Sequence, residues 1–138
     1  HYLAFVHGEL SKEQDDIKLK IGRSHKEARM AARPIKDEGK AAWTHYAVKE
    51  RFVGATLVDV EILSGRTHQI RAHFHGIGHP IIGDTLYKRK ETDRRIKAPR
   101  LMLQSVSLTF ADLDGTPRSF ALAPDPTFQV LQEEFRRS

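Results

Sequence analysis

Apolar and charged side chains alternate most regularly in the stretch Val58-Asp59-Val60-Glu61-Ile62. A period of two places the apolar residues on one face of a β-strand and the carboxylates on the other. The strand predicted here covers 55–63, and a second predicted strand over 43–50 precedes it. The residues between them, Arg51-Phe52-Val53-Gly54, suit a turn, so the two strands are expected to form a hairpin.

The periodicity changes after Ser64-Gly65. Ile70, Phe74 and Ile77 follow at the spacing of one helix face, and the two glycines of 76–78 then end the apolar run. The sequence therefore predicts that a strand ends, the chain turns, and a short helix begins within a few residues.

The rest of the chain contains further strand patterns and one more helix pattern. Strands are predicted over 2–8, over 17–21 as one alternating segment, at 81–82, and in a hairpin that joins 106–110 to 118–122 through a Gly-containing turn. Residues 26–40 are expected to be a basic connection, and the apolar spacing after residue 126 indicates a last helix. The fold class is therefore α+β, a mainly antiparallel, mixed β-sheet with a few short helices in one domain.

Composition excludes several classes of protein. The chain has 138 residues, a net charge of +5, a pI of about 9.6 and no cysteine. Disulfide scaffolds, thiol catalysis and cysteine-based zinc sites are thereby excluded. No stretch approaches the roughly 20 apolar residues of a membrane-spanning helix. We expect a cytoplasmic protein without a membrane segment.

Basic residues gather in two parts of the sequence. Seven lie between Lys18 and Lys36 against one acid, and seven lie between Thr85 and Arg100 against two acids. Because phosphates repeat along a nucleic-acid strand, several cations spread over a surface suit a partner such as RNA. The alternative is that both segments are solvated loops.

The densest chemistry follows the turn, where the ten residues of 64–73 hold two arginines, two histidines and a glutamine. Arg66 and Arg71 keep their charge at every physiological pH, so either could hold a phosphate or keep a carboxylate ionised. Gln69 can donate and accept hydrogen bonds, which suits the edge of a base. The alternative is a polar, exposed helix start.

Four histidines, His68, His73, His75 and His79, lie within twelve residues, a density that a metal site could use. No cysteine and no H-E-x-x-H pattern accompanies them, and glycines interrupt the helix before His79. We expect capping and packing histidines and no metal.

Two motifs carry a resemblance to a known family. They are Gly65-Arg66-Thr67-His68-Gln69-Ile70-Arg71-Ala72-His73 and Gly78-His79-Pro80-Ile81-Ile82-Gly83-Asp84. Together they closely resemble the RluA-type pseudouridine synthases, in particular those that modify large-subunit ribosomal RNA. Weaker matches extend over most of the chain, at 2–8, 42–46, 100–103 and 123–124.

The resemblance implies an enzyme that isomerises uridine to pseudouridine in RNA, expected to be ribosomal, without a cofactor. Tyr2 would stack on the target base, and Arg71 would pair with the catalytic aspartate. Arg66, His68 and Gln69 would shape the site. Five further basic residues would contact the RNA: Arg29, Arg33, Lys88, Arg89 and Lys90.

One departure from the family is as informative as the matches. The family's aspartate lies in an H-R-L-D-x-x-T-S-G motif, which does not occur in these 138 residues. Asp84 belongs to a different motif, and a turn or capping role is expected for it. We therefore expect 1–138 to be the C-terminal portion of a synthase catalytic domain, inactive without an N-terminal segment that carries the nucleophile. The alternative is a non-catalytic RNA-binding module.

Overall fold

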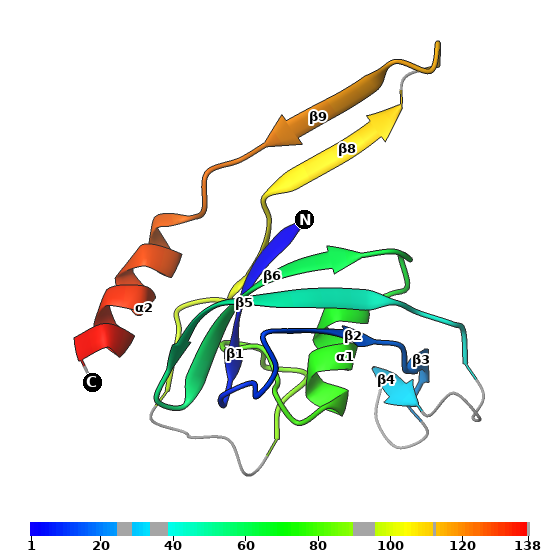
Figure 1. Ribbon diagram of the computed structural model, residues 1–138. Coiled ribbons are helices and arrows are strands. Elements are labelled where there is room, and N and C mark those ends of the chain that lie inside the picture. Colours follow the sequence, from blue (N-terminus) through cyan, green and yellow to red (C-terminus); the bar gives the residue numbers. More distant parts are fainter. Residues whose placement is uncertain (25–28, 34–38, 90–95, 112, 138) are drawn as a thin grey trace.

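A five-stranded antiparallel sheet forms the body of the protein, in the strand order β2-β5-β6-β1-β7 (Figure 1). The computed structural model describes all residues except 25–28, 34–38, 90–95, 112 and 138. The strands of this sheet are β1 (Tyr2–His7), β2 (Gln14–Ile17), β5 (Thr44–Phe52), β6 (Ala55–Ile62) and β7 (Leu103–Ser105). The predicted α+β class with a mainly antiparallel sheet is confirmed.

The predicted hairpin is the pair β5 and β6, which are neighbours inside the sheet. The period-two pattern is visible in the burial of β6: Val58 and Val60 are fully buried, whereas Glu61 is exposed. The turn at Gly54 has a φ of 79°, in the left-handed region that favours glycine. Local alternation and turn chemistry therefore agree with the tertiary structure here.

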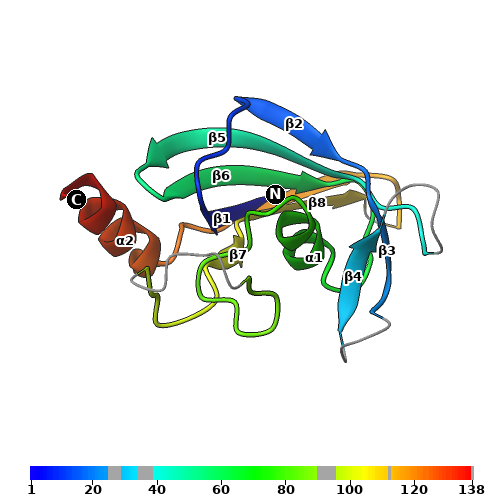
Figure 2. The same ribbon diagram turned by 90° about the horizontal axis from the view of Figure 1, so that it is seen from below.

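A helix packs on each face of the sheet (Figures 1 and 2). Helix α1 (Gln69–Gly76) covers one face, where the rings of Tyr46 and Phe74 lie 5.7 Å apart. Helix α2 (Pro126–Arg137) packs on the other face, where Phe5 stacks on Phe128 with centroids 5.9 Å apart. Both helices occur where their apolar spacing predicted them.

The strand predicted over 17–21 is wrong as a single element. The chain leaves the sheet after Ile17 and forms β3 (Lys20–Arg23), which pairs with β4 (Met30–Arg33) in a separate two-stranded sheet. Ile17 is buried in the main core, but Ile21 is buried in a second, smaller cluster. The apolar alternation runs from Ile17 to Ile21 because both residues are buried, but they are buried in different clusters. The strand β4 also lies in the segment that was predicted to be only a connection.

The predicted hairpin of 106–110 with 118–122 is confirmed as β8 (Ser107–Ala111) paired with β9 (Pro117–Ala121), and the structure shows that it projects from the body (Figure 1). The strand β7 was not predicted, because three residues are too few to show a period. At 81–82 the structure has a single bridge, between Val6 and Ile81, rather than a full strand. No helix in the described part of the chain has the length and apolar character needed to cross a bilayer.

Candidate active site

The turn from β6 into α1 has an unusual backbone. His68, which precedes the helix, has a φ of 50°, in the left-handed region that a non-glycine residue seldom adopts. Its ring contributes to holding the turn, since Nδ1 lies 3.0 Å from the hydroxyl of Tyr87. Strained residues of this kind persist where surrounding structure fixes them, and they are common at functional sites.

Gln69 stabilises this turn from inside the protein. Its side-chain nitrogen donates to the carbonyl of Trp43 at 2.9 Å and to Oγ1 of Thr44 at 3.0 Å. Its side-chain oxygen accepts from Oγ of Ser64 and from the amide of Arg66. The residue is only 3% exposed. With its amide fully engaged, Gln69 holds the turn together and does not fit the expected contact with a base.

His73 connects α1 to two other parts of the chain. Its Nε2 donates to the carbonyl of Leu19 at 2.6 Å, so its Nδ1, 2.7 Å from Oγ1 of Thr44, accepts from that hydroxyl. Burial lowers the pKa of His73, and the hydrogen bond to Leu19 only partly opposes this. His73 is therefore a neutral packing residue. Among the described residues, no three His, Cys, Asp or Glu side chains come together as a metal site.

Arg71 forms a bidentate ion pair with Asp84. Nε donates to Oδ2 at 2.9 Å and Nη2 donates to Oδ1 at 2.8 Å. The Asp84 side chain is fully buried and that of Arg71 is 20% exposed. The resemblance implied only the family's catalytic aspartate as the partner of Arg71, whereas the structure gives Arg71 an acidic partner within these 138 residues. The partner lies in the second motif, thirteen residues further along the chain.

Asp84 also closes its own turn, because Oδ1 accepts from the amides of Leu86 and Tyr87, each at 2.9 Å. The predicted turn role of Asp84 is thus confirmed. Burial alone would raise the pKa of Asp84, but the Arg71 guanidinium and the two amides together hold that pKa below its ordinary value. Asp84 is ionised, and its charge fixes the plane of the Arg71 guanidinium.

The ion pair does not use all of Arg71. A guanidinium carries five N–H donors, and the two bonds to Asp84 leave three. Within the described part of the chain Nη1 donates no hydrogen bond. Arg71 can therefore hold Asp84 and still present donors to a second anion.

A hollow of about 210 Å³ brings the motif residues together with the first tyrosine. It is lined by Tyr2 of β1, by Arg71 of α1 and by Leu103 of β7, and the turn contributes Arg66 and His68. Ile62, Ile70 and Gln69 complete the lining. The hollow thus combines an aromatic ring, an apolar floor and two permanent cations, which suits a flat anionic ligand such as a nucleotide.

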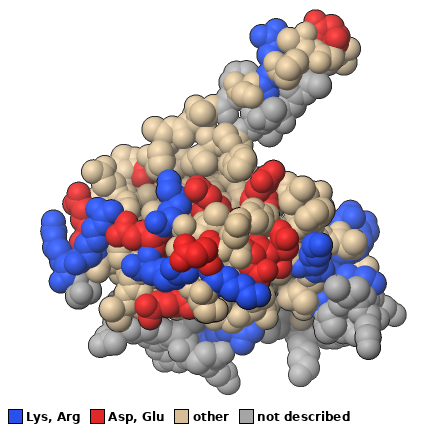
Figure 3. All heavy atoms as spheres, in the orientation of Figure 1, with Lys and Arg blue, Asp and Glu red and all other residues tan. Residues whose placement is uncertain are grey.

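The other basic residues predicted to bind RNA do not line this hollow. Arg29 lies over the ring of Tyr87, with its guanidinium carbon 4.9 Å from the centroid. Arg33 donates to the carbonyl of Arg23 and Arg89 to that of His75, whereas Lys88 is exposed. Lys90 lies outside the described residues. The face seen in Figure 3 mixes acidic with basic side chains and is not a uniformly positive surface.

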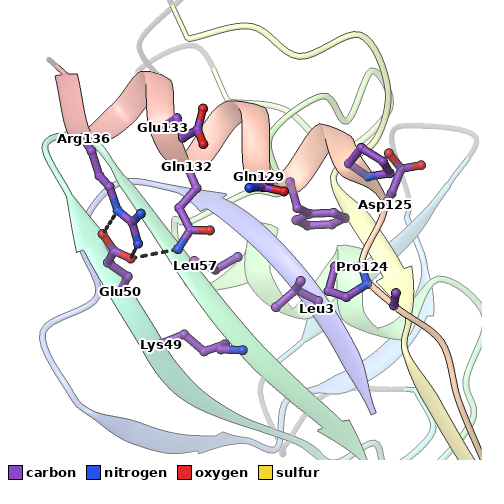
Figure 4. Close-up of a pocket in the computed structure, with 13 residues that line it drawn as sticks. Leu3, Lys49, Glu50, Leu57, Pro124, Asp125, Gln129, Gln132, Glu133 and Arg136 are labelled. Carbon is purple, nitrogen blue, oxygen red and sulfur yellow. Dashed lines mark hydrogen bonds and ion pairs between the residues drawn. The ribbon is translucent and has the colours of Figure 1, made fainter.

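A second hollow, of about 690 Å³, lies between α2 and the sheet (Figure 4). Its Glu50 carboxylate accepts from Arg136 at 2.6 and 2.8 Å and from Gln132 at 2.8 Å, and these bonds lower the pKa of Glu50 to about 2. Leu3 lines this hollow and Tyr2 lines the smaller one, so the two lie on opposite faces of β1. No motif residue reaches it, and we do not regard it as the candidate site.

Comparison with known proteins identifies the family of this chain. A family model described as RNA pseudouridylate synthase matches residues 1–76. Ribosomal large subunit pseudouridine synthase D of Nitrosomonas europaea is 45% identical over 95 residues, which are 67% of this chain and 26% of that protein. Ribosomal large subunit pseudouridine synthase C of Buchnera aphidicola is 32% identical over 127 residues, 89% of this chain and 40% of that protein.

Solved structures share the fold. Human RNA Pseudouridylate Synthase Domain Containing 1 superimposes with a TM-score of 0.79 at 23% identity, over 99% of this chain and 65% of that one. Human RNA Pseudouridylate Synthase Domain Containing 4 gives 0.77 at 19% identity, over 98% and 61%. This chain spans less than half the length of the curated relatives named above. Since the family model covers more than half of the chain and the relatives include synthases C and D, this chain belongs to the RNA pseudouridylate synthase family, in its RluA-type group.

Proposed function

We propose that this chain forms part of the active site of an enzyme that isomerises uridine to pseudouridine in RNA, with ribosomal RNA as the substrate. The observation that carries the proposal is the hollow that Tyr2 and Arg71 line together with Arg66 and His68. These are the residues that the family motifs single out. The same motifs also supply Asp84, which orients Arg71.

Each residue has a role that its surroundings support. A uridine drawn out of its stack loses stacking energy, which an aromatic ring such as Tyr2 can replace. The remaining donors of Arg71 would stabilise the carboxylate that attacks the nucleotide. Arg66 is exposed at the rim, where it can meet a phosphate. The glycosidic bond moves from nitrogen to carbon within one nucleotide, so the reaction needs no cofactor.

The nucleophile must come from elsewhere in the enzyme. Asp84 is buried and accepts hydrogen bonds from Arg71 and two backbone amides, so it cannot approach a substrate. The family's H-R-L-D motif does not occur among these residues. We therefore propose that an N-terminal segment supplies the aspartate and that this chain is the C-terminal portion of the catalytic domain. Alone, the chain would have no activity. We also propose that the enzyme acts in the cytoplasm.

The test uses the complete protein and measures tritium release from ribosomal RNA labelled at C5 of uridine. We expect Arg71→Lys to lower kcat by about 100-fold, because an ammonium cannot hold Asp84 with two parallel bonds and face a second carboxylate. Affinity for RNA should change by no more than about threefold, since the charge is kept. Lysine is preferred to alanine, which would leave Asp84 buried without a cation.

Lys49→Ala is the matched control, because Lys49 lines the hollow on the opposite face of the sheet and should leave turnover unchanged. Near-normal turnover of Arg71→Lys would refute the assigned role. The absence of the H-R-L-D motif from these residues favours one second candidate, a non-catalytic RNA-binding module. RNA binding by the complete protein without any tritium release would establish that candidate instead.

A further inference from the structure

We infer that the hollow beside Trp43 is a second RNA site, which binds the base and phosphate of a nucleotide adjoining the target uridine in a single strand. The inference rests on the proposed function and extends it to the neighbouring part of the substrate. The hollow measures about 430 Å³, and its lining includes Trp43, Leu63, Lys18, Lys20 and Arg66.

Trp43 presents a fixed aromatic surface to solvent. Trp43 is 40% exposed, and the neighbouring Leu63 is 51% exposed. The indole Nε1 donates to Oδ1 of Asp16 at 3.1 Å, which sets the orientation of the ring. Its backbone amide donates to Oγ of Ser64, and its carbonyl accepts from the amide of Leu63 and from Gln69. With its backbone held and its indole bonded to Asp16, the ring can stack on a base with a smaller loss of side-chain entropy than a ring without such contacts.

Cations line the hollow beside this ring. Nζ of Lys18 lies 4.5 Å from the indole centroid, and Lys20 and Arg66 line the same hollow. Asp16 is the acidic group that contacts Trp43. Its hydrogen bonds to Trp43 and His45 lower the pKa of its carboxyl group, so the carboxylate is already bonded within the protein. Lys18, Lys20 and Arg66 therefore line this hollow together with the indole ring. An aromatic surface among cations is the arrangement that binds single-stranded nucleic acid.

The two hollows share a wall. Arg66 lines both, and its Nε donates to the carbonyl of Ala41 at 2.8 Å, which fixes it between them. Gln69 lines the first hollow and holds the carbonyl of Trp43 beside the second. A strand with its target uridine at Tyr2 could thus place one phosphate at Arg66 and the adjoining base on Trp43.

The first test uses the fluorescence of Trp43, the single tryptophan of these 138 residues, in the complete protein. Its signal is the difference between the complete protein and its Trp43→Phe variant. Both are titrated with a short oligouridylate, and with versions in which one nucleotide at a time is made abasic. We expect saturable quenching that disappears when the base at one position is removed, although the phosphate remains. Quenching that survives every abasic replacement would mean a purely electrostatic contact and would overturn the inference.

The second test compares Trp43→Leu with Trp43→Phe by the fluorescence anisotropy of a labelled oligouridylate. Both variants lose the hydrogen bond to Asp16, so their difference isolates the aromatic surface. We expect Trp43→Leu to weaken binding by about five- to tenfold and Trp43→Phe by less than about twofold. Equal affinities of the two variants would overturn the inference, as would quenching by a polyglutamate peptide that matches quenching by RNA.

Failure of this inference can be told apart from failure of the proposed function. Tritium release and the KM for RNA are measured in the complete protein and in its Trp43→Leu variant. Tritium release with the same KM in both proteins would overturn the second site and leave the proposed enzyme intact. Position-specific quenching without tritium release by the complete protein would support the second site and refute the enzyme.

Discussion

Replacing Asp84 with asparagine tests the ion pair that orients Arg71. The substitution keeps the size of the side chain and one oxygen, which can still accept from the amides of Leu86 and Tyr87. The other position becomes an NH₂ group that faces a nitrogen of Arg71, so a donor meets a donor. Asp84→Asn therefore removes the charge and one strong hydrogen bond from a buried position.

The expected cost follows from the burial of the two partners. Removing one member of a buried ion pair costs about 3–5 kcal/mol when the other charge stays buried. Arg71 is 20% exposed and reaches water in part, and asparagine keeps the two amide contacts. We therefore expect a loss of about 2–3 kcal/mol in the free energy of unfolding. With a urea m-value of about 2 kcal/mol/M, the midpoint should fall by about 1–1.5 M at pH 7.

The pH dependence of this loss has a definite sign. The pKa of Asp84 in the folded protein is below its ordinary value, so its charge stabilises the fold above the unfolded pKa of about 3.9. That contribution disappears as the pH falls through the lowered pKa. The difference between Asp84 and asparagine in urea midpoint should therefore be constant from pH 5 to 7 and shrink below about pH 4.

A double-mutant cycle supplies the control. In an Arg71→Met background Asp84 has no cation, so Asp84→Asn should cost much less there than in the natural sequence. The same cost in both backgrounds would refute the argument, because it would place the stabilisation in the turn at Leu86 and Tyr87. A midpoint shift below about 0.3 M in the natural background would refute it as well.

Two further predictions concern the same region. Gly83→Ala should abolish folding or lower the free energy of unfolding by more than about 4 kcal/mol, because a Cβ there would overlap the carbonyl of Arg100. Gly78 has nearly the same φ (87° against 85°) but open space around it. Gly78→Ala should therefore lower the free energy of unfolding by only about 1–2 kcal/mol. Thermal unfolding of the two variants would measure this, and similar melting temperatures would contradict the steric account. Burial lowers the pKa of His73 in the folded protein, so the unfolded state takes up a proton at a higher pH than the folded state does. The free energy of unfolding should therefore fall as the pH drops below about 6.5. Urea midpoints of His73→Gln should show a flatter slope between pH 7 and 5, and an unchanged slope would exclude His73 as its source.

The parts of the fold that local patterns describe were predictable. Alternation over Val58–Ile62 identified β6, and the spacing of Ile70 and Phe74 identified α1 together with its end near Gly76. These two patterns were predictive because one face of each segment is more buried than the other, so the period of the sequence matches the period of burial there. The same reasoning failed at Ile17 and Ile21, which are buried in different layers although they fit a single alternating strand.

By itself, the sequence determined the family motifs and the residues that belong to them, since residue types and their spacing are local properties of the chain. Tertiary structure decided what those residues do. It gave Arg71 a carboxylate thirteen residues away, engaged the amide of Gln69 with Trp43 and Thr44, and placed Tyr2 beside both cations of the motif. The reason is that a hydrogen bond or ion pair depends on which surfaces meet after folding, and no period in the sequence records that meeting.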